Sequence, residues 1–87
     1  MTAENQPSKT EIELYVINKV KEKRIKLNLS QEDIARILDF SRGFIGQIES
    51  PLSASKYNLN HLNKLALEMG CSIQDFIPEL PIPENKE

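Results

Sequence analysis

The feature that most constrains this chain is a pair of short helical patterns separated by only a few residues. The first follows Ser30-Gln31-Glu32-Asp33, a capping box in which the serine hydroxyl and the aspartate carboxylate satisfy the free amides of a helix start. Apolar residues then recur at the spacing of one helix face over residues 31–38. Ser41 caps a second pattern over residues 41–50, which ends at Pro51 because the residue before a proline avoids helical angles. Such a tight turn sets two helices at a steep angle, so that the second presents its free face outward.

Three more segments carry a helix-start signal and apolar residues on one side. They run from the capping box Ser8-Lys9-Thr10-Glu11 to about Lys26, from Asn58 to Gly70, and from the capping box at Ser72 through Phe76-Ile77. Asn28 and Gly70 suit the left-handed position that often follows a helix, and Asp39 can take it in the turn at a modest cost. No segment alternates polar and apolar residues as a strand does. The sequence therefore predicts an all-α fold of five helices.

The predicted helices make up one domain, because 87 residues leave no room for a second core. Residues 1–10 are polar and predict a flexible N-terminus, residues 11–77 the helical domain, and residues 78–87 a proline-containing acidic tail. The predicted core residues are apolar and share one side of their helices: Ile34, Ile37, Leu38, Ile45, Ile48, Leu62, Leu65 and Ile73. Cys71 reads as a small buried residue between the last two helices.

The inventory of reactive side chains argues against an enzyme. The chain has one His and one Cys and no glycine-rich phosphate loop, so we expect no catalytic triad, no metal site, no cofactor and no small-molecule ligand. His61 reads as a surface residue and not a metal ligand, and Glu49 reads as a structural residue in a salt bridge with Arg36 or Lys56. No apolar run is long enough for a membrane span, no secretory signal is visible, and a lone thiol suits the cytoplasm.

Two stretches together identify a family resemblance. Leu29-Ser30-Gln31-Glu32-Asp33-Ile34-Ala35, followed by Ser41-Arg42-Gly43-Phe44-Ile45-Gly46-Gln47-Ile48-Glu49, resembles the phage repressor and Cro-like (XRE-type) helix-turn-helix family. The likeness extends over about residues 12–77. It implies a five-helix, repressor-like domain that binds double-stranded DNA as a homodimer and regulates transcription. The helix at about 41–50 would be the recognition helix, which lies in the major groove.

The resemblance also implies which residues contact DNA. Arg42 is the best candidate for reading a guanine, and Gln47 suits an adenine. Gln31 and Ser41 stand at helix starts, where side chains and amides can bind phosphate. A second group of phosphate contacts follows the recognition helix: Lys56, Tyr57 and Asn58. Phe44 has two open interpretations, a thymine methyl contact or packing under the loop 51–57.

Gly43 and Gly46 depart from the family pattern, because many relatives carry polar side chains there. The functional interpretation is that the glycines allow close approach to the bases. The alternative is that Gly46 permits tight packing against another helix. Each glycine costs the helix about 1 kcal/mol relative to alanine.

The charge balance keeps a second function open. The net charge is −2, whereas nucleic-acid-binding domains are usually basic. The alternative is a protein-interaction module of the same fold, with weak or no DNA binding and a toxin or regulator as its partner. Contacts between two copies of the chain are predicted among the apolar residues of its end: Phe76, Ile77, Leu80 and Ile82. Burial within the monomer fits these residues equally well.

Overall fold

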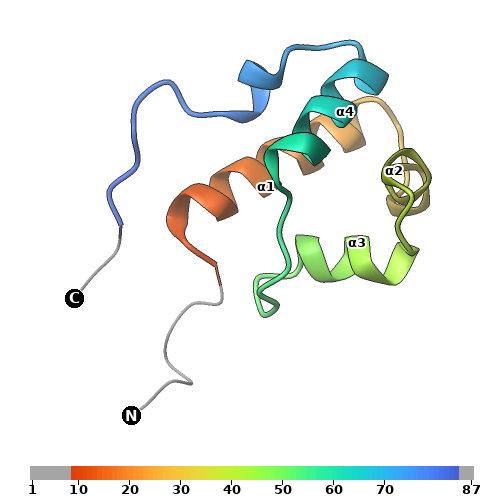
Figure 1. Ribbon diagram of the computed structural model, residues 1–87, viewed down its shortest axis with the longest axis horizontal. Coiled ribbons are helices and arrows are strands. Elements are labelled where there is room, and N and C mark those ends of the chain that lie inside the picture. Colours follow the sequence, from red (N-terminus) through yellow and green to blue (C-terminus); the bar gives the residue numbers. More distant parts are fainter. Residues whose placement is uncertain (1–8, 85–87) are drawn as a thin grey trace.

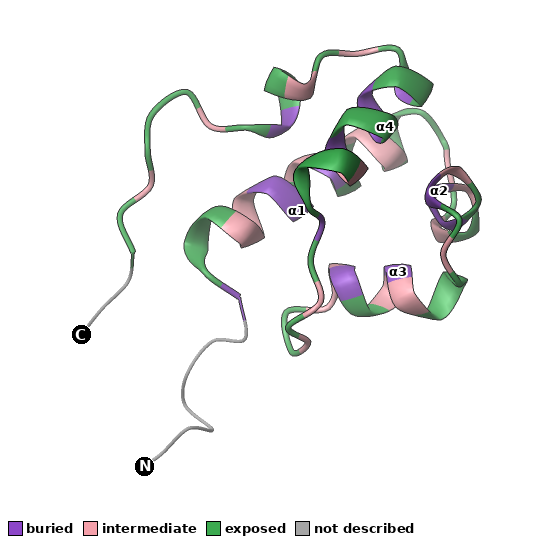
Figure 2. Ribbon diagram, viewed as in Figure 1, coloured by how far each residue is buried: buried purple, intermediate pink, exposed green. Residues whose placement is uncertain are grey.

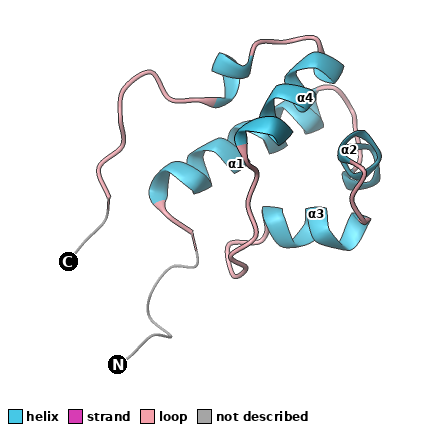
Figure 3. Ribbon diagram, in the orientation of Figure 1, coloured by secondary structure: helices cyan, strands magenta, loops and turns pink. Residues whose placement is uncertain are grey.

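The computed structural model describes residues 9–84, which form four α-helices and one 3-10 helix (Figure 1). The elements are α1 (Glu11–Lys26), α2 (Gln31–Leu38), α3 (Arg42–Glu49), α4 (Leu59–Met69) and the 3-10 helix η2 (Ile73–Phe76). Residues 9–84 contain no strand, which confirms the all-α class (Figure 3). The count of five α-helices is not matched. The fifth segment has only four residues of 3-10 helix, because Pro78 disfavours helical angles at Ile77, which is extended and ends the helix.

Local capping signals explain where the other helices begin and end. The Ser30 hydroxyl accepts a hydrogen bond from Asp33 N–H at 3.0 Å, and the Asp33 carboxylate accepts one from Ser30 N–H at 2.8 Å. Ser41, Asn58 and Ser72 cap their helices as predicted. Left-handed backbone follows three helices, at Asn28, Asp39 and Gly70. Each of these signals involves residues close together in sequence, so the sequence alone predicts them.

The first helix begins later than predicted. Its capping box is formed by Thr10 and Glu13, not by the equally spaced Ser8 and Glu11. Ser8 lies outside the described residues. Lys9 lies in the segment predicted as a flexible N-terminus, and its side chain is buried against the domain.

The core lies where α1, α2, α3, α4 and η2 meet. Its most deeply buried side chains come from all five elements: Val20, Ile34, Ile45, Ile48, Leu65 and Phe76. Ile37 and Ile73, predicted as core, pack against it only partly buried, as does Cys71. Phe76 contributes to this core, so it is not available as a contact between copies. None of the helices within residues 9–84 is long and apolar enough to cross a membrane.

The position of α3 matters for function. α3 lies at one border of the molecule, and its buried residues face the other helices while the opposite side is exposed (Figure 2). The packing of α2 against α3 sets the orientation of this exposed side.

Candidate nucleic-acid interface

The turn between α2 and α3 has the geometry that the sequence predicts. Asp39 adopts left-handed angles (φ 62°, ψ 43°), and its N–H donates to carbonyls of the last turn of α2. Phe40 N–H donates to Ala35 O at 2.8 Å, which closes the turn. Ser41 then begins α3, and its hydroxyl accepts a hydrogen bond from Phe44 N–H at 3.1 Å. The amides of Asp39 and Phe40 are therefore satisfied by carbonyls of α2, and only three residues separate α2 from α3.

One face of α3 is anchored and the other is open. Ile45 and Ile48 are completely buried, whereas Arg42, Gly43 and Gln47 are exposed. No segment of the described chain covers this outward side. Arg42 makes no ion pair within residues 9–84. The Arg42 guanidinium is thus available to a partner molecule, and the Gln47 side chain is exposed, with its Oε1 accepting a hydrogen bond from Ser55 Oγ at 3.4 Å.

The two glycines of α3 are not required by packing. A Cβ atom added at Gly43 would meet nothing within 4 Å, and one at Gly46 would lie 3.7 Å from Gln31 Oε1, an ordinary van der Waals contact. Neither residue has a positive φ angle. The interpretation that Gly46 permits tight packing against another helix is therefore wrong. Gly43 is exposed and Gly46 is partly exposed, so α3 has no side chain at these two positions of its outer side.

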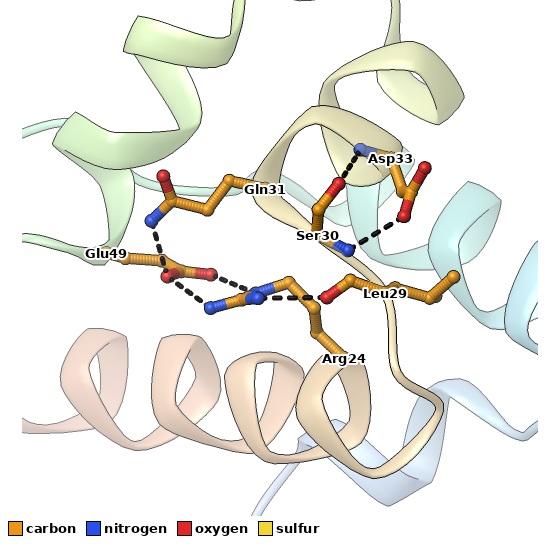
Figure 4. A network of polar contacts seen from close by, with 6 residues as sticks. All are labelled: Arg24, Leu29, Ser30, Gln31, Asp33 and Glu49. Carbon is orange, nitrogen blue, oxygen red and sulfur yellow. Dashed lines mark hydrogen bonds and ion pairs between the residues drawn. The ribbon is translucent and has the colours of Figure 1, made fainter.

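A buried polar network fixes the far end of α3 (Figure 4). Arg24 Nε and Nη2 donate to the two carboxylate oxygens of Glu49 at 2.9 and 3.1 Å. Arg24 Nη1 also donates to Leu29 O at 3.0 Å. The exposed fractions of the Arg24 and Glu49 side chains are 12% and 5%. This ion pair links α1 to the C-terminus of α3, so it holds the orientation of the exposed face.

Gln31 extends the same network. Its Nε2 donates to Glu49 Oε1 at 3.0 Å, which ties the start of α2 to the end of α3. The Gln31 side-chain nitrogen is therefore engaged inside the protein. Of the phosphate donors predicted at this helix start, the free backbone amides remain. Glu49 is in a structural salt bridge as predicted, but its partner is Arg24 and not Arg36 or Lys56. Arg36 instead pairs with Asp33 and Glu32 on the surface of α2.

A family model described as a helix-turn-helix domain matches residues 17–78, most of the chain. The chain belongs to the helix-turn-helix family. No curated protein and no solved structure matches it. The matched region includes the turn, the exposed face of α3 and the Arg24–Glu49 ion pair.

Aromatic packing supports the turn of this helix-turn-helix domain. The Phe44 ring meets Phe40 edge-on, with centroids 4.8 Å apart, and Phe40 meets His61 in the same way at 4.9 Å. Phe44 is half-buried and packs on the turn residue Phe40. His61 accepts a hydrogen bond at Nδ1 from Asn58 N–H at 3.0 Å, and burial lowers the pKa of its imidazole.

The loop that follows α3 differs most from prediction. Lys56 Nζ donates to Glu13 Oε2 at 2.7 Å, and this hydrogen bond is the main cause of the lowered pKa of Glu13. Tyr57, predicted as a phosphate contact, belongs to the core, and its buried hydroxyl has no hydrogen-bond partner among residues 9–84. Its side chain therefore cannot reach a phosphate. Desolvation, with the nearby charge of Glu49, raises the pKa of this phenol well above its ordinary value. Asn58 is exposed and caps α4.

Proposed function

We propose that this helix-turn-helix protein binds double-stranded DNA sequence-specifically and regulates transcription as a phage repressor- or Cro-like homodimer. The observation that carries the proposal is the exposed side of α3, which is anchored from behind by Ile45 and Ile48 and offers Arg42 and Gln47 to a partner. An α-helix of this kind fits the major groove. No cofactor or small-molecule ligand is needed for this activity.

Each exposed group has a role that its chemistry suits. The Arg42 guanidinium can donate two hydrogen bonds to O6 and N7 of a guanine, and the Gln47 amide can pair with an adenine. Ser41, Lys56 and Asn58 surround these residues and suit phosphate contacts, which set the register on the duplex. Gly43 and Gly46 let the α3 backbone approach the base edges closely. In a dimer, the two copies of α3 would enter successive major grooves about 34 Å apart.

Of the residues that the sequence suggests for a dimer interface, the exposed ones near the end of the described chain remain candidates. Leu80 is 75% exposed and Ile77 is also exposed, whereas Phe76 is buried. Solution mass measured with and without DNA tests this part of the proposal. A monomer on a DNA site that contains a single half-site would exclude the homodimer.

The experiment on DNA binding starts from selection of preferred duplexes out of a random pool, followed by fluorescence anisotropy. Arg42→Ala should lower the preference for the selected duplex over a random one by about tenfold to a hundredfold, the value of one good bidentate contact. Lys64→Ala is the matched control, because Lys64 is an exposed cation on α4 away from the proposed interface. Failure of the wild-type protein to prefer any duplex would exclude sequence-specific binding.

A second candidate function is a protein-interaction module of the same fold. The pairing of Lys56 with Glu13 favours it, because this pair neutralises a cation next to α3, and the chain as a whole carries a net charge of −2. Such a module would show no measurable affinity for duplex DNA even at low salt, where nonspecific binding is strongest.

A further inference from the structure

The start of the described chain is attached to the loop that follows α3. The side chain of Lys9 is buried, with 3% of the residue exposed. Its Nζ donates to Ser50 O at 2.5 Å and also to Ser53 O. These contacts join positions 41 and 44 residues apart in sequence. Burial is the main cause of the lowered pKa of the ammonium group, and Lys56 adds to it while Glu13 opposes it.

The end of α3 explains why a cation is placed there. Ser50 is extended (φ −84°, ψ 129°), so α3 lacks the left-handed cap that would satisfy its last carbonyls. Pro51, which follows, has no N–H to offer. The C-terminus of a helix carries a partial negative charge that favours a cation. Lys9 supplies this charge, and its ammonium donates to the carbonyl of Ser50, directly after α3, and to that of Ser53 in the loop. It has no carboxylate partner within 4.0 Å in the described chain. A buried ammonium is costly unless it is fully hydrogen-bonded, so this placement ties Lys9 closely to the two carbonyls.

A second contact holds the other end of the same loop. Glu13 lies one helical turn after Lys9 and binds Lys56 at 2.7 Å. Between the two contacts, Ser55 Oγ donates to Gln47 Oε1 at 3.4 Å, which connects the loop to the exposed face of α3. The segment 9–13 thus fixes residues 50–56 at both ends, directly beside Gln47.

We propose that Lys9 is a positioning residue of the DNA interface: it holds the loop 50–56 against α3 so that Lys56 is presented beside the groove-facing residues. The proposal rests on the proposed DNA-binding function. It extends the interface to a residue that lies before the region matched by the family model, residues 17–78. Lys9 acts through the loop and does not itself contact DNA, because its ammonium is buried on two carbonyls.

The first test needs no DNA. In the wild-type protein, NMR should show slow solvent exchange of the Lys9 ammonium protons, in contrast to those of exposed Lys64. In Lys9→Met, heteronuclear NOE values should fall for residues 52–56 and stay unchanged in α2 and α4, while Lys64→Met leaves the loop unaltered. Lys9 ammonium protons that exchange as fast as those of Lys64 would overturn the proposal, and this result is accessible even if Lys9→Met fails to fold.

The second test is a double-mutant cycle on DNA affinity. Lys9→Met and Lys56→Met should each weaken binding about tenfold on selected and random duplexes alike, and each should reduce the slope of log affinity against log salt by less than one, because Lys56 is already paired with Glu13. The double variant should bind no more weakly than the weaker single variant, because both changes remove the same phosphate contact. Additive losses of about a hundredfold, or an unchanged salt slope in Lys9→Met, would refute positioning through the loop. If the wild-type protein binds no DNA, the proposed function fails, but the NMR test still decides whether Lys9 holds the loop.

Discussion

The two glycines of α3 are expected to lower the free energy of unfolding, and substitution by alanine measures this loss directly. Gly43 and Gly46 both lie inside an eight-residue helix, with φ angles that alanine adopts freely. Glycine in a helix interior loses more backbone entropy on folding than alanine does. Because a new Cβ meets open space at Gly43 and only the Gln31 side-chain oxygen, 3.7 Å away, at Gly46, nothing offsets this gain. Gly43→Ala and Gly46→Ala are therefore expected to stabilise the protein.

The expected magnitude follows from helix propensity alone. Each substitution should raise the free energy of unfolding by about 0.5–1 kcal/mol, and the two together by about 1–2 kcal/mol. For a domain of this size, 1 kcal/mol corresponds to a shift in Tm of roughly 4–8 °C. The double variant should accordingly unfold at a clearly higher temperature than the wild type.

Gly70→Ala provides the matched control. Gly70 also has open space around a new Cβ, but its φ is +68°, which strains any residue with a side chain. The same chemical change should therefore destabilise the protein by about 1–2 kcal/mol at this position. Urea denaturation at pH 7 with thermal melts by circular dichroism gives all three values. Destabilisation by Gly43→Ala would refute the reasoning, because it would mean that α3 is not the exposed, unstrained helix described above.

The same variants separate stability from function. If the glycines serve close approach to the bases, Gly43→Ala and Gly46→Ala should weaken binding to the selected duplex while they stabilise the fold. Nonspecific affinity, which depends on phosphate contacts, should change little. Unchanged specific affinity would exclude the close-approach role and leave Arg42 and Gln47 as the readers of sequence.

Two further predictions concern groups behind the interface. Glu49→Met leaves Arg24, whose side chain is 12% exposed, without its carboxylate. It should cost about 1–3 kcal/mol, with partial recovery in the Arg24→Met/Glu49→Met double variant; a loss below about 0.5 kcal/mol in urea denaturation would contradict a part-buried, hydrogen-bonded pair. Burial lowers the pKa of His61, so below the ordinary value of about 6.5 the unfolded chain binds more protons and stability falls as the pH falls. His61→Gln keeps an acceptor for Asn58 N–H and should flatten the change in urea midpoint between pH 7 and 5.5; an equally steep change would exclude His61 as its source.

Helix starts and ends were predictable because each depends on residues within one turn of chain. Ser30, Ser41 and Asn58 bond amides three residues away, and Asp39 needs only its own left-handed backbone. At the first helix, two equally spaced capping boxes competed, and the sequence alone does not choose between them. Lys9, the residue before Thr10, is hydrogen-bonded to the carbonyls of residues 50 and 53. This contact fixes the chain directly before the Thr10–Glu13 capping box against the domain.

The partners of buried polar groups were not predictable in this way. Glu49 and Arg24 are 25 residues apart, so their pairing depends on how α1 crosses α3 and not on any local spacing. Tyr57 illustrates the same limit, since a tyrosine in a polar loop suits either a phosphate or the core. Its burial follows from the packing of the loop against α1 and α4, which is a property of the whole fold.

The electrostatics of the proposed interface follow from the pairing of Lys56 with Glu13. The Lys56 ammonium already donates to a Glu13 carboxylate oxygen at 2.7 Å. A phosphate that binds Lys56 therefore shares or displaces this carboxylate, and fewer counterions are released than on engagement of a free lysine. Arg42, which has no ion pair in the described chain, does not carry this cost. The salt dependence of binding should therefore be shallower than the number of interface cations suggests. Sequence preference, which depends on Arg42 and Gln47, should in consequence account for a larger share of the affinity than in a basic domain.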